Sequence, residues 1–257
     1  MKYLLLLPLI LCCSVQPIRQ HQVIESKAHD WKELKVATTA YGETRAIYSG
    51  QSSKFKYAQA EAHSVNSHQS LKWEQIPPGH EQLLIVKSGI IEYLTTETTE
   101  ILEEGSVLID FPGSNYSIKN PNEEVAEYYL ISWKLEEDMN STIPKTIPIV
   151  QHWKEVAFQK TEKGGRRNII RQPTHLLQEF EMHVTTLNEG EKSHDPHTHI
   201  EEEIILVRFG EVEELIDGVP HQVGPGSLIF LRSEVPHGIR NIGKGPCEYY
   251  AFKWKVS

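Results

Sequence analysis

Four residues near the C-terminus have the types and the spacing of a metal site. They lie in two segments, Gly190-x6-His197-x-His199-x3-Glu203-x6-Gly210 and Gly226-x10-His237-x3-Asn241. Three imidazoles and one carboxylate are ligands for a divalent transition metal, and they leave coordination positions open for water, substrate or oxygen. The sequence therefore predicts a metal site without fixing its reaction.

Two neighbouring strands are expected to carry these ligands. Alternate residues of a strand face the same side, so the His-x-His pair, Glu201 and Glu203 are expected to project together. Asp217-Gly218 predicts a hairpin turn, and His237 then follows on a second strand. Glu203 is a candidate both for metal ligation and for catalysis. Glu201, on the same face, is a second candidate acid or base, although a carboxylate at the barrel mouth is the simpler interpretation.

The two segments resemble the motifs of the cupin family: a glycine, a His-x-His pair, a glutamate and a glycine, then a glycine, a proline, a histidine and an asparagine. The first motif has six residues before its first histidine where the family has five, and Arg232 and Glu234 replace the usual proline and glycine. The resemblance implies an all-β fold of double-stranded β-helix barrels, which are jelly-roll-like, with the metal inside. It assigns the ligand role to His197, His199, Glu203 and His237.

An internal repeat organises the rest of the chain. A shift of 121 residues places Gly89 on Gly210 and Trp133-Lys134 on Trp254-Lys255. Upstream, a shift of 122 places Trp31-Lys32-Glu33 on Trp153-Lys154-Glu155, in a short helical turn or a first edge strand. Short apolar, β-branched runs bounded by glycine and proline complete an all-β pattern. The sequence therefore predicts two tandem barrels, each of ordinary domain size.

These observations predict the following organisation along the chain: a signal peptide at 1–13, an N-terminal arm or tether at 14–30, an N-terminal cupin barrel at 31–140, a linker at 141–150, and a C-terminal cupin barrel at 151–257.

The first barrel is predicted to have lost the metal site. The repeat aligns the four ligands with Ile76, Pro78, Gln82 and Tyr116. Glycines, tryptophans and a tyrosine pair are retained, which indicates packing and turn positions rather than chemistry. An insertion between Ser67 and Pro78 would leave another option, an irregular site formed by His63, His68 or His80.

The composition is that of a soluble globular protein, with 39% hydrophobic and 24% charged residues. The net charge is −9 and the chain has no lysine- or arginine-rich run. These features argue against nucleic acid or an anionic membrane surface as a partner. The expected partner is a small-molecule substrate, and the cupin resemblance implies a possible homodimer.

The N-terminus resembles an export signal. Met1-Lys2 precedes an apolar run from Tyr3 to Leu11, which is too short to span a bilayer. Its end resembles a bacterial lipoprotein signal, with Cys13 as the lipidated residue, and simple cleavage is the alternative. The expected location is outside the cytoplasm: periplasmic, extracellular or lipid-anchored to a bacterial envelope. Cys247 is the one cysteine beyond this segment, which excludes a disulfide framework.

The predicted function is that of a metal-dependent bicupin enzyme with one divalent transition metal, Mn, Fe, Ni or Zn. The resemblance implies dioxygenase or oxidoreductase chemistry, or isomerase or lyase chemistry, on a small oxygenated metabolite or sugar acid. The alternative is a non-catalytic module that uses the metal to bind a small molecule or carbohydrate. A purely structural metal is disfavoured because structural sites are normally closed.

Overall fold

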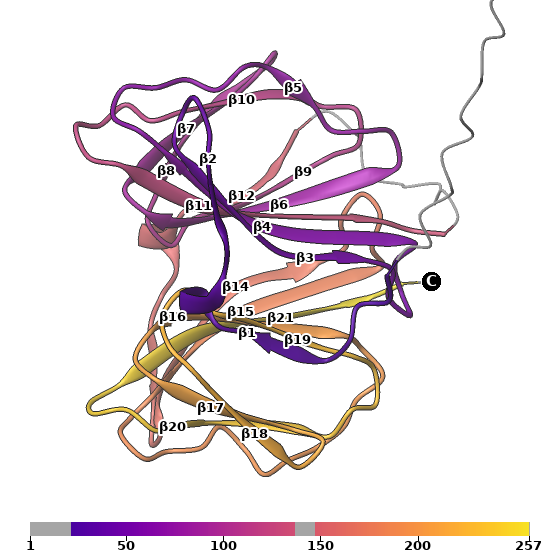
Figure 1. The fold of residues 1–257 in the computed structure, drawn as a ribbon, viewed down its shortest axis with the longest axis vertical. Helices are drawn as coiled ribbons and strands as arrows, with labels where there is room; N and C mark the ends of the chain where they lie inside the picture. The colour runs from indigo at the N-terminus through magenta and orange to yellow at the C-terminus, as the bar shows by residue number, and fades with distance from the viewer. Residues whose placement is uncertain (1–21, 137–146, 257) are drawn as a thin grey trace, which may run out of the picture.

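A computed structural model of the protein describes residues 22–136 and 147–256, which are almost entirely β-structure. Figure 1 shows two barrel-like halves stacked on one another, each with a large sheet facing the other half and a smaller sheet on the outside. The predicted all-β fold is confirmed. The predicted signal segment, Cys13, and parts of the predicted arm and linker lie outside the described residues. No helix in the described ranges is long and apolar enough to cross a membrane.

The N-terminal barrel pairs a seven-stranded sheet, β12-β9-β6-β11-β4-β3-β2, with a four-stranded sheet, β5-β10-β7-β8. Its strands are β2 (Val36–Thr38), β3 (Glu43–Gly50), β4 (Tyr57–Val65), β5 (Glu74–Gln75), β6 (His80–Ser88), β7 (Ile90–Thr95), β8 (Thr99–Glu103), β9 (Val107–Asp110), β10 (Asn115–Lys119), β11 (Ala126–Lys134) and β12 (Ile149–Gln151). The pairings within both sheets are antiparallel, so alternate side chains point into the barrel.

The C-terminal barrel pairs a seven-stranded sheet, β1-β19-β16-β21-β15-β14-β13, with a three-stranded sheet, β18-β17-β20. Its strands are β1 (Lys27–His29), β13 (Gln159–Thr161), β14 (Gly164–Gln172), β15 (Glu179–Leu187), β16 (Glu203–Phe209), β17 (Val212–Ile216), β18 (Val219–Val223), β19 (Leu228–Leu231), β20 (His237–Asn241) and β21 (Cys247–Lys255). The hairpin predicted at Asp217-Gly218 is confirmed, since both residues have positive φ and join β17 to β18.

The two halves exchange their first strands. Strand β1, from the start of the chain, pairs with β19 of the C-terminal barrel, and β12, from the start of the second repeat, pairs with β9 of the N-terminal barrel (Figure 1). The predicted boundaries therefore differ from the structure, because the arm and the linker each contribute a strand to the barrel of the other repeat. Strands of three residues carry too little periodicity to be recognised in the sequence.

A 3-10 turn follows each exchanged strand, η1 (Trp31–Glu33) and η2 (Trp153–Glu155), as one of the two expected forms. Each turn fixes its tryptophan against a glycine of the opposite barrel. The Trp31 and Trp153 backbone N–H groups donate to the hydroxyls of Ser227, at 3.0 Å, and Ser106, at 3.1 Å. Gly226 and Gly105 directly precede these serines. A Cβ atom at Gly226 would lie 2.7 Å from the Trp31 ring, and one at Gly105 would lie 2.6 Å from the Trp153 ring, so glycine is required at both positions.

One hydrophobic core joins the two large sheets. Phe55 of the first repeat stacks on Trp133 at 6.0 Å between ring centroids and on Trp254 of the second repeat at 5.0 Å. Trp133 in turn stacks on Phe180, at 6.2 Å. Because aromatic burial dominates core energetics, these shared rings make the pair of barrels a single packed unit.

Two buried carboxylates also connect the halves, in opposite directions. Glu202 accepts hydrogen bonds from the Ser52 hydroxyl at 2.7 Å, and from the Ser53 hydroxyl at 2.8 Å and backbone N–H at 2.9 Å. Glu81, 121 residues earlier, accepts from the Thr174 hydroxyl and the His175 backbone N–H, each at 2.7 Å. We call these contacts the Glu202 latch and the Glu81 latch.

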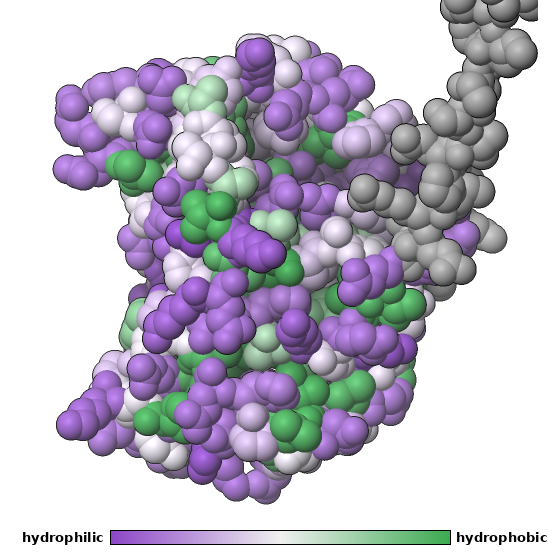
Figure 2. Space-filling view, viewed as in Figure 1, coloured by the Kyte–Doolittle hydropathy of each residue, from purple (hydrophilic) through white to green (hydrophobic). Residues whose placement is uncertain are grey.

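Hydrophilic residues predominate on the molecular face in Figure 2, where hydrophobic residues form scattered spots rather than one continuous surface. The buried apolar side chains form one cluster between the two large sheets and one inside each barrel.

Candidate metal centre

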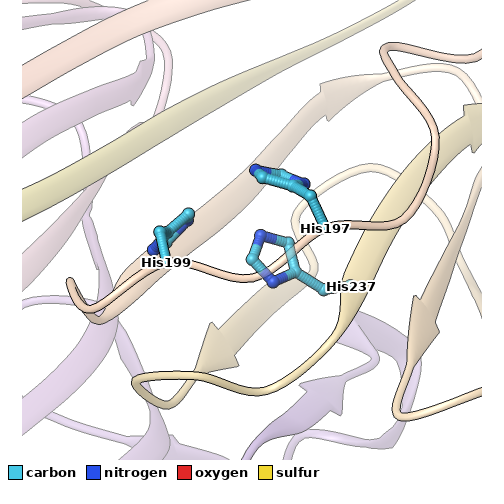
Figure 3. A group of neighbouring side chains, drawn as sticks. All are labelled: His197, His199 and His237. Carbon is cyan, nitrogen blue, oxygen red and sulfur yellow. The ribbon is translucent and has the colours of Figure 1, made fainter.

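Three imidazoles converge inside the C-terminal barrel, as Figure 3 shows. One ring nitrogen from each of His197, His199 and His237 lies within 4.8 Å of the other two. The ring centroids are 4.7 Å apart for His197 and His237, and 4.9 Å apart for His199 and His237. This is the one group of at least three potential metal ligands in the described ranges that meets so closely.

Different backbone elements supply these side chains. His237 begins β20, and its backbone forms two hydrogen bonds with His197, of 3.0 and 3.1 Å. His199 lies in the loop that leads into β16, and Glu203 is the first residue of that strand. The expectation that one strand carries the His-x-His pair and both glutamates is therefore wrong. Before Glu203 the chain is not part of a strand, and its one pairing near the ligands is the isolated bridge between His197 and His237.

The Glu203 carboxylate contacts two of the three histidines. Its Oε2 atom lies 3.2 Å from Nε2 of His199 and 3.2 Å from Nε2 of His237. Burial by itself would raise the pKa of Glu203, but hydrogen bonds and charge from the two histidines outweigh it and lower the pKa to about 2. The same contact raises the pKa of His199.

The orientation of the rings fits a cation. The Nδ1 atoms of His199 and His237 each lie 2.8 Å from a backbone carbonyl, of Glu201 and Val235 respectively, to which a protonated Nδ1 donates. In a neutral ring that tautomer leaves Nε2 unprotonated toward the Glu203 carboxylate. Either a second proton on each ring, which forms the hydrogen bonds that lower the pKa of Glu203, or a metal ion must then lie between these atoms. Nε2 of His237 is buried without a hydrogen-bond partner. A metal ion at the centre would satisfy all of these atoms, so the residues fit the group that they were predicted to bind.

A polar cavity of about 220 Å³ opens beside the group. The four predicted ligands line it together with residues of other strands, among them His183, Glu214, Tyr249 and Lys253. A space of this size suits a small polar molecule next to the ion.

Glu201 stands apart from the cavity. It is absent from the cavity wall, and its Oε2 atom lies 3.8 Å from Nδ1 of His199, whose ring its backbone carbonyl orients. Glu201 therefore lies beside the ligand His199 and outside the cavity wall, and its catalytic role stays a prediction. The loop before β16 turns the Glu201 side chain away from the side that strand alternation would give it.

Two further histidines near the site, His194 and His183, differ in their surroundings. His194 is exposed, and its ring centroid lies 4.1 Å from that of His197. His183 lies on β15 and faces the cavity. Burial and the charge of Arg166 lower the pKa of His183 to about 4, so this imidazole is neutral at ordinary pH.

Sequence reasoning missed Glu214, which is 1% exposed and lies on the cavity wall. Burial, with a smaller contribution from the charge of Glu203, raises the pKa of Glu214 to about 8. A signal was available in the alternation along β17, where Val212 and Ile216 are apolar and the residue midway between them must share their inward face.

The first barrel has no histidine at the corresponding place, but the structural correspondence differs from the sequence alignment. Tyr116, which aligns with His237, pairs with Glu74 across β10 and β5, as His237 pairs with His197. Glu74, and not Ile76, therefore occupies the position of His197.

His199 corresponds to Ile76 rather than to Pro78. The Ile76 carbonyl accepts a hydrogen bond from the Gly113 N–H, as the His199 carbonyl accepts from that of Glu234, and Gly113 aligns with Glu234. Gln82, which aligns with Glu203, lies six positions after Ile76, whereas Glu203 lies four positions after His199. This difference of two residues shifts the alignment upstream of Gln82.

The other histidines of the first barrel do not gather. His63 pairs with Glu61 at 3.3 Å, and His68 pairs with Glu123 at 3.1 Å. The His80 ring packs edge-on against Tyr57, with ring centroids 6.1 Å apart. Within the described ranges they form no group of three ligands, so the alternative site is not supported.

Comparison with known proteins agrees with this geometry. Residues 183–253 match the family model for a cupin domain, and this segment contains all four predicted ligands. The chain thus contains a cupin domain in its C-terminal half, and its overall fold is that of cupin structures. No curated protein sequence matched it.

Solved structures share the cupin fold along most of the chain. AerE from Microcystis aeruginosa has a TM-score of 0.67 and 13% identity, over 86% of this chain and 96% of its own. Ylba from E. coli has a TM-score of 0.69 and 16% identity, over 92% and 94%. A mutant of the Bacillus subtilis oxalate decarboxylase OxdC has a TM-score of 0.70 and 12% identity, over 94% and 80%. At these identities the likeness shows the fold alone.

Proposed function

We propose that the protein is a metal-dependent cupin enzyme whose C-terminal barrel acts on a small oxygenated metabolite or sugar acid. The observation that carries this proposal is the meeting of three imidazoles and the Glu203 carboxylate at one end of a polar cavity. Oxygenase or oxidoreductase chemistry is the first candidate, and isomerase or lyase chemistry is the second. A bound divalent transition metal would polarise an oxygen atom of the substrate there.

The chain prepares the site in two ways. The backbone carbonyls of Glu201 and Val235 fix the tautomers of two ligands, so that both Nε2 atoms face the centre. Glu203 stays anionic at any physiological pH because its pKa is about 2. Buried side chains such as Ile205, Ile239 and Tyr249 form part of the cavity wall, whereas the ligand His197 on the same wall is exposed to solvent.

Manganese is the first metal to test, before iron, nickel and zinc. Another structure of the Bacillus subtilis oxalate decarboxylase is described for its Mn(II) centres. The donor set of three imidazoles and one carboxylate accepts any of the four metals, so ligand type does not decide among them.

Elemental analysis tests the proposal first. Protein produced with manganese or iron in the medium should retain about one equivalent of metal after gel filtration, and His237→Ala should retain almost none. The loaded protein is then incubated with small hydroxy, keto and dicarboxylic acids while oxygen uptake and carbon dioxide release are followed. Metal binding with no turnover would favour the binding-module alternative, and failure to bind metal would overturn the proposal.

We also propose that the chain is exported and lipidated at Cys13, on the strength of the apolar run before it. Labelling with a fatty-acid analogue should mark the wild-type protein and spare Cys13→Ser. Cleavage without a label would favour simple secretion. A homodimer remains a prediction that sedimentation can test.

A further inference from the structure

Glu214 shares the inward face of the barrel with the ligand His237. Strands β17 and β20 pair antiparallel, with Ile216 opposite His237 and Glu214 opposite Ile239. Directly opposed residues face the same side, so Glu214 and His237 are diagonal neighbours on one wall. Both residues line the same cavity. A second carboxyl group therefore points into the space beside the predicted metal.

No side chain donates a hydrogen bond to either oxygen of Glu214, although the residue is 1% exposed. Leaving a buried carboxyl group without side-chain donors costs about 1–3 kcal/mol or more. The other charged groups on the cavity wall do not donate to Glu214 either: Arg166 forms an ion pair with Glu181 at 3.4 Å, and Lys253 forms no hydrogen bond with Glu214. The backbone of Gly238 lowers the pKa of Glu214 slightly, but no side chain donates to its oxygens, so a molecule that enters the cavity can supply the missing donor.

The first barrel shows that the fold does not require a carboxyl group here. Tyr93 occupies the position of Glu214, 121 residues earlier, and stacks on Tyr116 with ring centroids 5.3 Å apart. Its hydroxyl donates to Asp110 at 2.7 Å. A tyrosine at this position fills the barrel, and its hydroxyl has a hydrogen-bond acceptor. Packing therefore does not explain the glutamate in the second barrel.

We propose that Glu214 is a specificity-determining residue that accepts a hydrogen bond from a hydroxyl or ammonium group of the substrate. The inference rests on the proposed function, which puts a carboxylate or carbonyl oxygen of the same molecule at the metal. The substrate class is then a 2-hydroxy or 2-amino acid, whose hydroxyl or ammonium group donates to Glu214. The second carboxylate of a dicarboxylic acid has no proton to donate and would also lie near the anionic Glu203. The hydroxyl or ammonium group of the substrate is then the hydrogen-bond donor to Glu214 that the surrounding side chains do not provide.

Four two-carbon acids test this assignment: acetate, glycolate, glycine and oxalate. They differ in one group, and each is titrated into the manganese-loaded wild type, Glu214→Leu and Glu214→Gln by calorimetry. The preference for glycolate over acetate should fall about tenfold in Glu214→Leu, since a site built to accept a hydrogen bond loses that discrimination. Glu214→Gln keeps an acceptor oxygen and should retain most of it. Above pH 8, where Glu214 is ionised, oxalate should bind Glu214→Leu more tightly than it binds the wild type.

Two further measurements separate this role from a structural one. Metal content should be the same in all three proteins, and Glu214→Leu should unfold at a higher temperature than the wild type because a buried, unpaired carboxyl group has been removed. A preference for glycolate that survives in Glu214→Leu, or an equal loss for acetate and glycolate, would overturn the inference while the metal site stands. A wild-type protein that binds no metal would overturn the proposed function and this inference with it.

Discussion

The two barrels place different chemistry on the same scaffold. Where the C-terminal barrel has Glu214 and His237, the N-terminal barrel has Tyr93 and Tyr116, whose rings lie nearly parallel and fill the interior. The tyrosine hydroxyls find acceptors on Asp110 at 2.7 Å and on Glu74 at 3.1 Å.

The difference separates what folds the protein from what the site needs. Both barrels keep the glycines, the exchanged strand and a cross-barrel latch. In the second barrel, Glu214 and Nε2 of His237 are buried without hydrogen-bonding side chains to satisfy them. Buried polar atoms without partners lower the stability of the fold, which is typical of a binding site whose ligand provides those partners.

The largest expected effect is on metal binding. His237→Ala removes one of four ligands and should weaken manganese binding more than about a hundredfold, beyond the loss typical of groups that only support ligands. Tyr116→Phe, at the matching position of the first barrel, should leave the metal stoichiometry unchanged. Elemental analysis and calorimetry on both variants test this, and equal losses would mean that the first barrel also takes part in binding.

The next effect is on stability. Tyr93→Glu gives the first barrel the carboxyl group of the second and removes the stacked ring, which should lower the free energy of unfolding by about 3–5 kcal/mol. Tyr93→Phe keeps the ring and loses the hydrogen bond to Asp110, at about 1–3 kcal/mol. Urea unfolding followed by tryptophan fluorescence measures both. If Tyr93→Glu is tolerated, the first barrel has room and donors that its contacts do not show.

Much of this arrangement could be predicted from the sequence. The four ligands share residue types and motif spacing, and the repeat of 121 residues marks the two barrels. These features are local or periodic, so they survive without knowledge of the tertiary structure.

The remaining features depend on contacts between distant segments. The exchanged strands β1 and β12 have three residues each, and their partners β19 and β9 lie far away in sequence or in the other repeat. Glu201 follows the path of a loop that strand alternation cannot describe. Glu214 was within reach from its place between the apolar Val212 and Ile216 on β17, but a glutamate that directly follows another glutamate gives no further sign of burial.

The Glu202 latch offers a finer comparison because Glu202 directly precedes the ligand Glu203. Ser52→Ala with Ser53→Ala removes two hydroxyl donors from Glu202 and should loosen the loop that carries His199. Groups that support ligands commonly change metal affinity 10–100-fold, so we expect a loss of about tenfold in manganese affinity by calorimetry.

Thr174→Ala is the matched control, since it removes a hydroxyl donor from Glu81 in the barrel that lacks the histidines. It should lower the unfolding temperature as the serine variants do, and leave manganese affinity unchanged. An equal fall in affinity for both latches would show that they act through general stability rather than through the ligand loop.

The smallest effect is a pH dependence of the Glu81 latch. Burial raises the pKa of Glu81 from 4.5 to about 7, although Thr174, the His175 backbone and Trp133 donate hydrogen bonds to it. Between these two values the unfolded chain releases a proton that the folded chain retains, so stability present below pH 4.5 is lost as the pH rises through 7. Glu81→Gln cannot titrate and should remove this decline.

Unfolding temperatures of the metal-free wild type and Glu81→Gln, measured from pH 4.5 to 8, isolate the titration. The lost hydrogen bonds shift the variant by an amount that does not depend on pH, whereas the carboxyl group contributes only the pH-dependent part. The difference, variant minus wild type, should therefore rise between pH 4.5 and 7 and then level off. A constant difference across the range would mean that Glu81 is charged in the folded protein at low pH, with its donors outweighing its burial.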